Sequence, residues 1–383
     1  MARRWNILAW SVLAAVFLGM SVYLLLNPTR TGVVPNYRMA ATNWWIGQPV
    51  YGTGTHGFLY FPQFILFFTP FNLIRPEILG EILWRAFGFG LFGWGLGKLA
   101  EIFNRQHGRM GASDPTLLWI TLLAVPASLA SLNNGQTNLP LSACLVLGAW
   151  ALRGGRWNQA AVWFSLAVIL KPIALAPWCL AFAVFPRMRK PLLIGLVPLA
   201  FLGLAHPDVS YAGERWVKCL QKIFHSYIPE NLRVSDCFGA IARSGVHVPP
   251  LLEKGTRALA SLGALAWVWR SYRQQGLARA SWALWVVTVL VFTVFNPRAE
   301  TNSYVLASPL LAFLAVDHLL RPGGNRLAGW ILAGACLGLM CDGMGRTIYR
   351  ATDVWLKPFL VILVSPLLFR MPEGWRVKDW QSA

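Results

Sequence analysis

Apolar segments recur along almost the whole chain, and this recurrence limits the architectures it can adopt. Of its 383 residues, 56% are hydrophobic and 13% are charged. A transmembrane helix needs about 20 mostly apolar residues. Candidate spans of this kind lie at about 5–27, 57–74, 78–100, 115–131, 138–152, 158–170, 172–186, 191–205, 258–270, 281–295, 303–320, 327–341 and 354–369.

The fold class follows from how backbone groups are satisfied in lipid. Each span must satisfy its own hydrogen bonds, and the alternating pattern of an outer-membrane barrel is absent. We therefore expect an all-α polytopic integral membrane protein. It would form a single membrane domain over residues 1–383, with about 11–13 transmembrane helices because several candidate spans are short. Two outer loops would stand apart from the spans, 28–56 and the larger 206–257.

The charge balance fits this interpretation. Lys and Arg number 34 against 15 Asp and Glu, giving a net charge of +19. The basic residues lie in short loops between apolar spans, where they orient the protein and meet anionic lipid headgroups. A nucleic-acid partner is therefore not expected. By the positive-inside rule the basic loops are cytoplasmic; they are 153–156, 187–190, 270–279 and 321–326. The loops left outside are 132–137, 206–257, 296–302 and 342–353.

One segment conflicts with this topology. The N-terminal arginines place loop 28–56 outside, yet three apparent spans separate it from loop 132–137, where an even number is needed. One of the three is therefore not a simple crossing. The candidates are the proline-broken segment 57–74 and the segment 78–100, which carries Glu81 and Arg85.

Loop 28–56 and its continuation are rich in aromatic and amide side chains, among them Tyr37, Trp44 and Tyr60. Such residues suit stacking on a sugar, although an interfacial aromatic belt explains them more readily. No acid precedes Glu77, so His56 is the titratable candidate near neutral pH within this loop.

Three further polar stretches interrupt the apolar runs. Loop 132–138 has four amide side chains where a plain turn needs only Asn-Gly. Lys171 interrupts an apolar stretch, either as a phosphate ligand or as a lysine that extends to the interface. Arg298 and Glu300 form either a salt-bridged turn or a phosphate clamp with a carboxylate.

Loop 206–257 is the only large hydrophilic region, and its segment ERWVKCLQKIFH predicts an amphipathic interfacial helix. Its length favours a helix that caps a cavity over one that is plain surface. The six cysteines show no metal-binding spacing, and Cys219 and Cys237 are either paired or free.

Taken in order, these stretches resemble the bacterial glycosyltransferase family 87, the polyprenol-phosphate-mannose-dependent mannosyltransferase-like membrane proteins. The residues that carry the resemblance are Tyr37, Ala40-Ala41, Gly47-Gln48-Pro49-Val50-Tyr51, Tyr60-Phe61-Pro62, Thr69-Pro70, Trp84, Asn134-Gly135-Gln136-Thr137-Asn138, Leu170-Lys171-Pro172, Asn296-Pro297-Arg298, Glu300 and Asn302-Ser303-Tyr304.

The resemblance implies a GT-C helical bundle in the bacterial cytoplasmic (inner) membrane, with its reaction centre under the first extracytoplasmic loop. It implies an inverting hexosyltransferase that needs no metal and no cofactor. The enzyme would transfer a mannose-like hexose or a pentose from a polyprenyl-phosphate sugar to a lipid or glycan acceptor, with membrane lipids around it.

Roles follow for individual residues. Lys171 and Arg298 would bind the donor phosphate, and Glu300 would be the base, with His56 as an alternative. The sugar-binding candidates are Tyr37, Trp44, Tyr60, Asn134, Gln136, Asn138, Asn302 and Tyr304. The chain departs from the family in two places: residues 31–36 contain no acid where members usually carry an Asp, and Ser303 stands where many carry a His.

This departure supports a second hypothesis, a catalytically silent relative that serves as a structural or lipid-binding subunit beside a protein partner. A transporter is a third hypothesis, against which stand the absence of an inverted repeat and of an acidic relay beyond Glu81 and Asp317.

Overall fold

The computed structural model describes residues 2–29, 32–52, 57–108, 114–225, 234–352 and 354–376, and within these ranges the chain forms helices and no strands. This confirms the expected all-α class. The α-helices are α1 (Ala2–Leu26), α2 (Val34–Trp45), α3 (Pro62–Leu73), α4 (Glu77–Gln106), α5 (Thr116–Ala124), α6 (Leu129–Asn134), α7 (Asn138–Arg153), α8 (Trp157–Leu170), α9 (Leu175–Val184), α10 (Pro186–Leu202), α11 (Val209–His225), α12 (Cys237–Arg243), α13 (Pro250–Leu290), α14 (Ser308–Leu320), α15 (Arg326–Gly338), α16 (Arg346–Thr352) and α17 (Leu356–Leu368).

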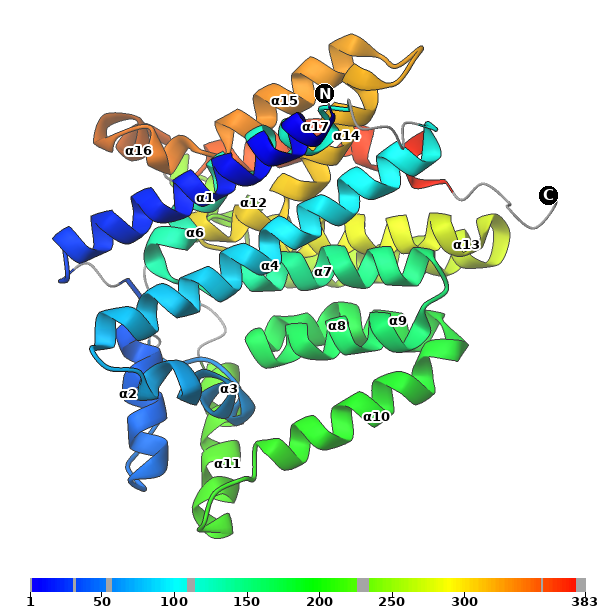
Figure 1. Ribbon diagram of the computed structural model, residues 1–383. Helices are drawn as coiled ribbons and strands as arrows, with labels where there is room; N and C mark the ends of the chain where they lie inside the picture. The colour runs from blue at the N-terminus through cyan, green and yellow to red at the C-terminus, as the bar shows by residue number, and fades with distance from the viewer. Residues whose placement is uncertain are drawn as a thin grey trace.

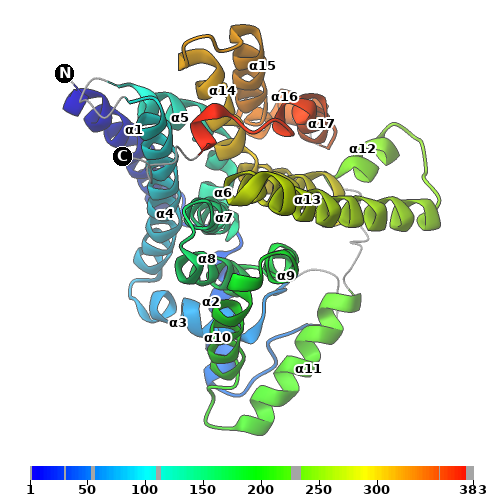
Figure 2. The same cartoon turned by 90° about the vertical axis from the view of Figure 1, so that its right-hand side faces the viewer.

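The long helices lie side by side, and shorter ones cover one end of the bundle. In Figure 1, α4, α7 and α13 run across the molecule, while α2, α3 and α11 gather at the left-hand end. Helix α7 packs against α4, α8 and α13, which places it near the centre. Figure 2 shows α15 and α17 on one side of α13 and α10 on the other.

Three helical segments of the described chain are by themselves long and apolar enough to cross a membrane: Arg4–Leu26, Thr116–Asn134 and Pro250–Phe295. The bent pair α16 and α17 would be a fourth if it forms one span, and several shorter apolar helices accompany them. The helix count of about 11–13 stays a prediction.

Helix α13 turns back on itself at Gly276, whose φ of 82° is outside the helical range. Arg257 contacts the backbone carbonyl of Phe295, 38 residues further along the chain. A straight helix would separate such residues by about 57 Å. The element is therefore a helical hairpin with two arms, in agreement with the separate spans predicted at 258–270 and 281–295.

Of the two candidates, segment 57–74 fits a segment that does not cross the membrane, and the topology that this implies stays a prediction. Its helix α3 has 12 residues, about 18 Å in length, against a hydrocarbon core of about 30 Å. Arg38 Nη1, before α3, donates to the carbonyl oxygen of Glu77, after it, at 3.0 Å. The chain before and after this segment therefore comes close together, as expected for a segment that enters and leaves on one face.

The polar loop between α6 and α7 is positioned by α4. Buried Arg85 donates from Nε to the Leu132 carbonyl oxygen at 3.0 Å and from Nη2 to that of Asn133 at 3.0 Å. Trp84 Nε1 donates to the Gly135 carbonyl oxygen at 2.8 Å. Gly135, with φ of 63°, ends α6 in the left-handed conformation that favours glycine. The carbonyl oxygens at the end of α6 therefore point toward α4. The side chains that follow Gly135 turn toward the end of the bundle where α2 and α11 lie.

Candidate functional site

A cavity of about 600 Å³ opens at the end of the bundle where α2 and α11 lie. Six of the residues predicted from the sequence line it: Tyr37, Tyr60, Gln136, Lys171, Arg298 and Glu300. They come from four separate stretches of the chain, so the fold brings together polar residues that the sequence shows only as isolated interruptions. A cavity of this volume, lined by both polar and apolar side chains, is typical of a binding site for a small molecule.

A chain of hydrogen bonds crosses the polar side of this cavity. Lys171 Nζ donates to Asn138 Oδ1 at 2.8 Å, and Asn138 Nδ2 donates to Gln136 Oε1 at 2.8 Å. Gln136 Nε2 then donates to Glu300 Oε2 at 3.1 Å. Because an ammonium only donates and a carboxylate only accepts, the orientation of both amides is fixed by the two ends. The contact with Asn138 also places Lys171 at the same end of the bundle as loop 132–137.

Glu300 has a second, structural role. It is the residue before the short 3-10 helix Thr301–Leu306, and its carboxylate caps the backbone N–H of Ser303. The Ser303 hydroxyl in return accepts from the Glu300 backbone N–H at 3.1 Å, which completes a capping box. Among the described residues that line the cavity, Glu300 is the only carboxylate.

Tyr37 and Tyr60 form a hydroxyl pair on the α2 side, with their oxygens 2.7 Å apart. The Tyr60 hydroxyl also lies 3.4 Å from Thr137 Oγ1. Burial, followed by the neighbouring Tyr60, raises the pKa of Tyr37 well above its usual value, and burial also raises the pKa of Tyr60. Both phenols are therefore neutral hydrogen-bonding groups at ordinary pH.

Part of the cavity lining is apolar. Leu220, Ile223 and Phe224 of the amphipathic helix α11 line the cavity together with Ile173 and with Leu175, the first residue of α9. The predicted interfacial helix of loop 206–257 thus contributes apolar side chains to the site. The site combines charged groups with apolar side chains that suit a hydrocarbon chain.

Several predicted sugar-binding residues are not at the cavity. Trp44 is fully buried and packs against His206 and Tyr211. Asn134 and Asn302 do not line the cavity, and their backbone carbonyl oxygens accept bonds from Val33 N–H and the Ser131 hydroxyl. Asn138 does not line the cavity either, and its side chain is connected to the site by its hydrogen bonds with Lys171 and Gln136. His56 lies outside the described residues.

Tyr304 is also structural. Its side chain is fully buried, and its hydroxyl lies 2.6 Å from the carbonyl oxygen of Ser235 and 2.8 Å from that of Thr293. An aromatic residue in this loop is equally consistent with core packing, so its sequence context did not distinguish the two roles.

We expect Tyr304→Phe to lower the free energy of unfolding by about 1–3 kcal/mol, because buried carbonyl groups lose their donor. The transition temperature in detergent measures this. Transfer per folded molecule should change less than about threefold. A large loss of turnover at unchanged stability would instead place this tyrosine in the reaction.

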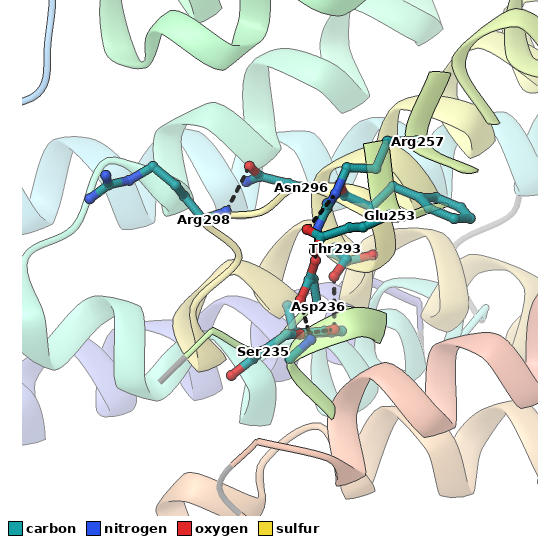
Figure 3. Close-up of polar contacts among 10 residues, drawn as sticks. Ser235, Asp236, Glu253, Arg257, Thr293, Asn296 and Arg298 are labelled. Atoms are coloured by element: carbon teal, nitrogen blue, oxygen red, sulfur yellow. Dashed lines mark hydrogen bonds and ion pairs between the residues drawn. The ribbon is translucent and has the colours of Figure 1, made fainter. Parts of the chain in front are cut away.

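Sequence reasoning missed Arg257, Asn36 and Asn296, which also line the cavity. Figure 3 shows Arg257 pointing toward Asp236 and Glu253. Its guanidinium is ion-paired with buried Asp236 and lies 2.7 Å from Glu253 Oε1. Asp236 also caps α12 through Gly239 N–H at 2.7 Å. The cluster ties the start of α12, within the outer loop 206–257, to α13, and only the fold brings Asp236 to Arg257.

Arg257→Met should destabilise the protein by about 3–5 kcal/mol, because a buried carboxylate remains without its cation. Lys254→Met, at an exposed position of the same helix, is the matched control and should cost less than about 0.5 kcal/mol. Thermal unfolding of both variants in one detergent gives the comparison. Equal transition temperatures would show that the ion pair does not stabilise the loop.

Comparison with solved structures identifies the fold. The crystal structure of ArnT from Cupriavidus metallidurans, determined with undecaprenyl phosphate bound, matches over 98% of this chain and 74% of its own, with a TM-score of 0.54 and 17% identity. ArnT is a GT-C glycosyltransferase and a polytopic membrane protein, so the fold defines a multi-pass helical membrane protein of the GT-C class.

A comparison of the sequence with models of protein families shows the family of this chain. The model of glycosyltransferase family 87 matches residues 58–297, and the chain belongs to this family. The matched range contains α3 to α13 and most of the cavity, including Lys171. No curated protein matches the chain. The chain is therefore a membrane glycosyltransferase by family, as the ordered motifs predicted.

Proposed function

We propose that the protein transfers a mannose-like hexose or a pentose from a polyprenyl-phosphate sugar to a lipid or glycan acceptor. The observation that carries this proposal is the cavity that combines Lys171 and Arg298 with Glu300 and with apolar side chains. Two cations suit a phosphate, and the apolar side chains suit the isoprenoid chain attached to it. The undecaprenyl phosphate bound to the similar ArnT supports this donor class.

The residues have distinct roles in the proposed step. The acceptor hydroxyl attacks the anomeric carbon from the face opposite the phosphate, and Glu300 takes the hydroxyl proton. As the new glycosidic bond forms, the bond between the anomeric carbon and the phosphate oxygen breaks. The electron pair leaves with the phosphate, whose added charge Lys171 and Arg298 stabilise. Tyr37, Tyr60 and Gln136 bind sugar hydroxyls.

The location follows from the topology. Basic loops occupy one face, and the cavity lies at the end carrying loops 132–137 and 296–302. We propose the extracytoplasmic face of a bacterial inner membrane for this end, which agrees with the positive-inside rule.

One observation favours the alternative, a catalytically silent relative. The Glu300 carboxylate already caps Ser303 and accepts from Gln136. These bonds explain its presence at the loop without a chemical role. A silent subunit would bind lipid phosphate in the same cavity and copurify with a protein partner in fixed ratio.

The proposal is tested by measuring sugar transfer by the purified protein in lipid. Labelled polyprenyl-phosphate mannose, glucose and arabinose are each supplied with a total lipid extract, and labelled product is counted. Product from one donor supports the proposal and identifies the sugar. Binding of all donors without product would favour the silent subunit.

A further inference from the structure

A second cavity, of about 430 Å³, lies on the other side of α2 from the site described above. Tyr37 lines the first cavity, and the next residue, Arg38, lines the second. The walls come from the ends of α1 and α3, from α2, and from the start of α4. Neither the family match nor the proposed reaction accounts for this cavity.

Arg38 presents an unmet hydrogen-bond donor to this cavity. The residue is only 7% exposed, and its Nη1 donates to the Glu77 carbonyl oxygen at 3.0 Å. Its Nη2 lies 3.3 Å from Glu77 Oε1 but makes no hydrogen bond within the described part of the chain. Glu77 therefore compensates part of the charge of Arg38 but does not satisfy this N–H donor, and a ligand oxygen that accepts its hydrogen bond would be stabilised.

The surrounding charges favour an anionic ligand. Arg75 stands at the mouth, 3.9 Å from Glu77, and buried Glu81 is paired with Arg85 at 3.3 Å. Arg38 and Arg75 line the cavity and share the carboxylate of Glu77, whereas Glu81 is compensated by Arg85, which does not line it, so a positive charge remains at the lining. Guanidinium groups match the geometry of phosphate oxygens through paired N–H donors.

The rim indicates a lipid as the source of that anion. Met39 lines the cavity and is 51% exposed, and two further exposed leucines, Leu26 and Leu73, lie close in sequence to the lining residues Pro28 and Asn72. Because the chain is a membrane protein, exposed apolar side chains around a charged pocket face acyl or isoprenoid chains. A charged pocket beside exposed apolar side chains suits a lipid, whose charged headgroup is joined to a hydrocarbon tail.

We propose that this second cavity binds the phosphate group of a lipid, with Arg38 as its principal ligand. The lipid is either a membrane phospholipid, which offers a phosphodiester, or a polyprenyl phosphate, which offers a phosphomonoester. Both present an anionic oxygen that can accept the hydrogen bond left unmade by Arg38 Nη2, next to a hydrocarbon chain that covers the exposed apolar side chains.

The proposal is tested by counting the lipids that bind to the full chain. The purified protein is titrated separately with phosphatidylglycerol and with undecaprenyl phosphate, and native mass spectrometry gives the affinity of each bound lipid. Arg38→Gln should weaken one binding event about tenfold or more. Met39→Trp, which fills the mouth from an exposed position, should do the same without touching the ion pairs. The lipid that is affected identifies the source.

Lys171→Met is the matched variant in the first cavity and should leave this binding event unchanged. The assay needs no turnover, so absence of transferase activity would refute the proposed reaction and not this site. Unaltered affinity and stoichiometry for both lipids in both Arg38→Gln and Met39→Trp would overturn the proposal, given native helix content in each variant.

Discussion

The Glu300→Gln variant should transfer sugar about 10²–10⁴-fold more slowly than the wild type, the usual contribution of a general base. The amide keeps a side-chain oxygen that can cap Ser303 and accept from Gln136, so the loop should stay folded. Initial rates with the preferred donor, at saturating acceptor, measure the effect. Donor affinity should change little, because the loss is in the chemical step.

Ser303→Ala is the control for the cap. It removes the bond from the Glu300 backbone N–H to the serine hydroxyl and leaves the carboxylate in place. We expect a stability loss of about 1 kcal/mol and transfer within a few fold of wild type. Full transfer by Glu300→Gln would exclude this carboxylate as the base. A silent protein would show no transfer with or without the substitution.

Lys171→Met should weaken binding of the polyprenyl-phosphate donor about 10- to 100-fold, the loss expected for a charge-assisted hydrogen bond. The change also removes the donor to Asn138, so Gln136 is less well oriented toward Glu300. We therefore expect a lower maximal rate in addition to the weaker binding. Binding of the undecaprenyl phosphate probe and steady-state rates separate the two effects.

Lys218→Met is the matched control for this substitution. Lys218 is exposed on α11 and does not line the cavity, so removing its charge should leave donor affinity and rate within about twofold. If both variants lose affinity equally, the effect comes from the net charge of the outer face. It would then not report a phosphate contact at Lys171.

The charged and amide residues of the site were predictable from the sequence because they interrupt apolar runs. Gln136, Lys171, Arg298 and Glu300 stand in or beside segments where a polar group is costly, and all four line the cavity. Their proposed chemical roles remain predictions. The all-α class was predictable for the same reason, since lipid permits few ways to satisfy a backbone.

The aromatic residues were less predictable, because the same side chains serve cores and binding sites. Tyr37 and Trp44 are both buried on α2, yet only Tyr37 reaches the cavity. Arg257 was missed because its partner Asp236 is distant in sequence. The apolar side chains of α11 reach the cavity only because of where this helix packs against the bundle. The hydrophobic periodicity of its sequence does not specify that position.

The length of helix α3 affects on which side of the membrane each later loop is predicted to lie. If this helix enters and leaves on one face, each later loop keeps the side that the positive-inside rule predicts for it. About eight more apolar residues would bring it to the length of a true crossing. Every downstream loop would then exchange faces, and Lys171 and Glu300 would meet the opposite leaflet from the loop that carries Tyr37. In the predicted topology, a helix of 12 residues therefore decides which leaflet supplies lipids to the site.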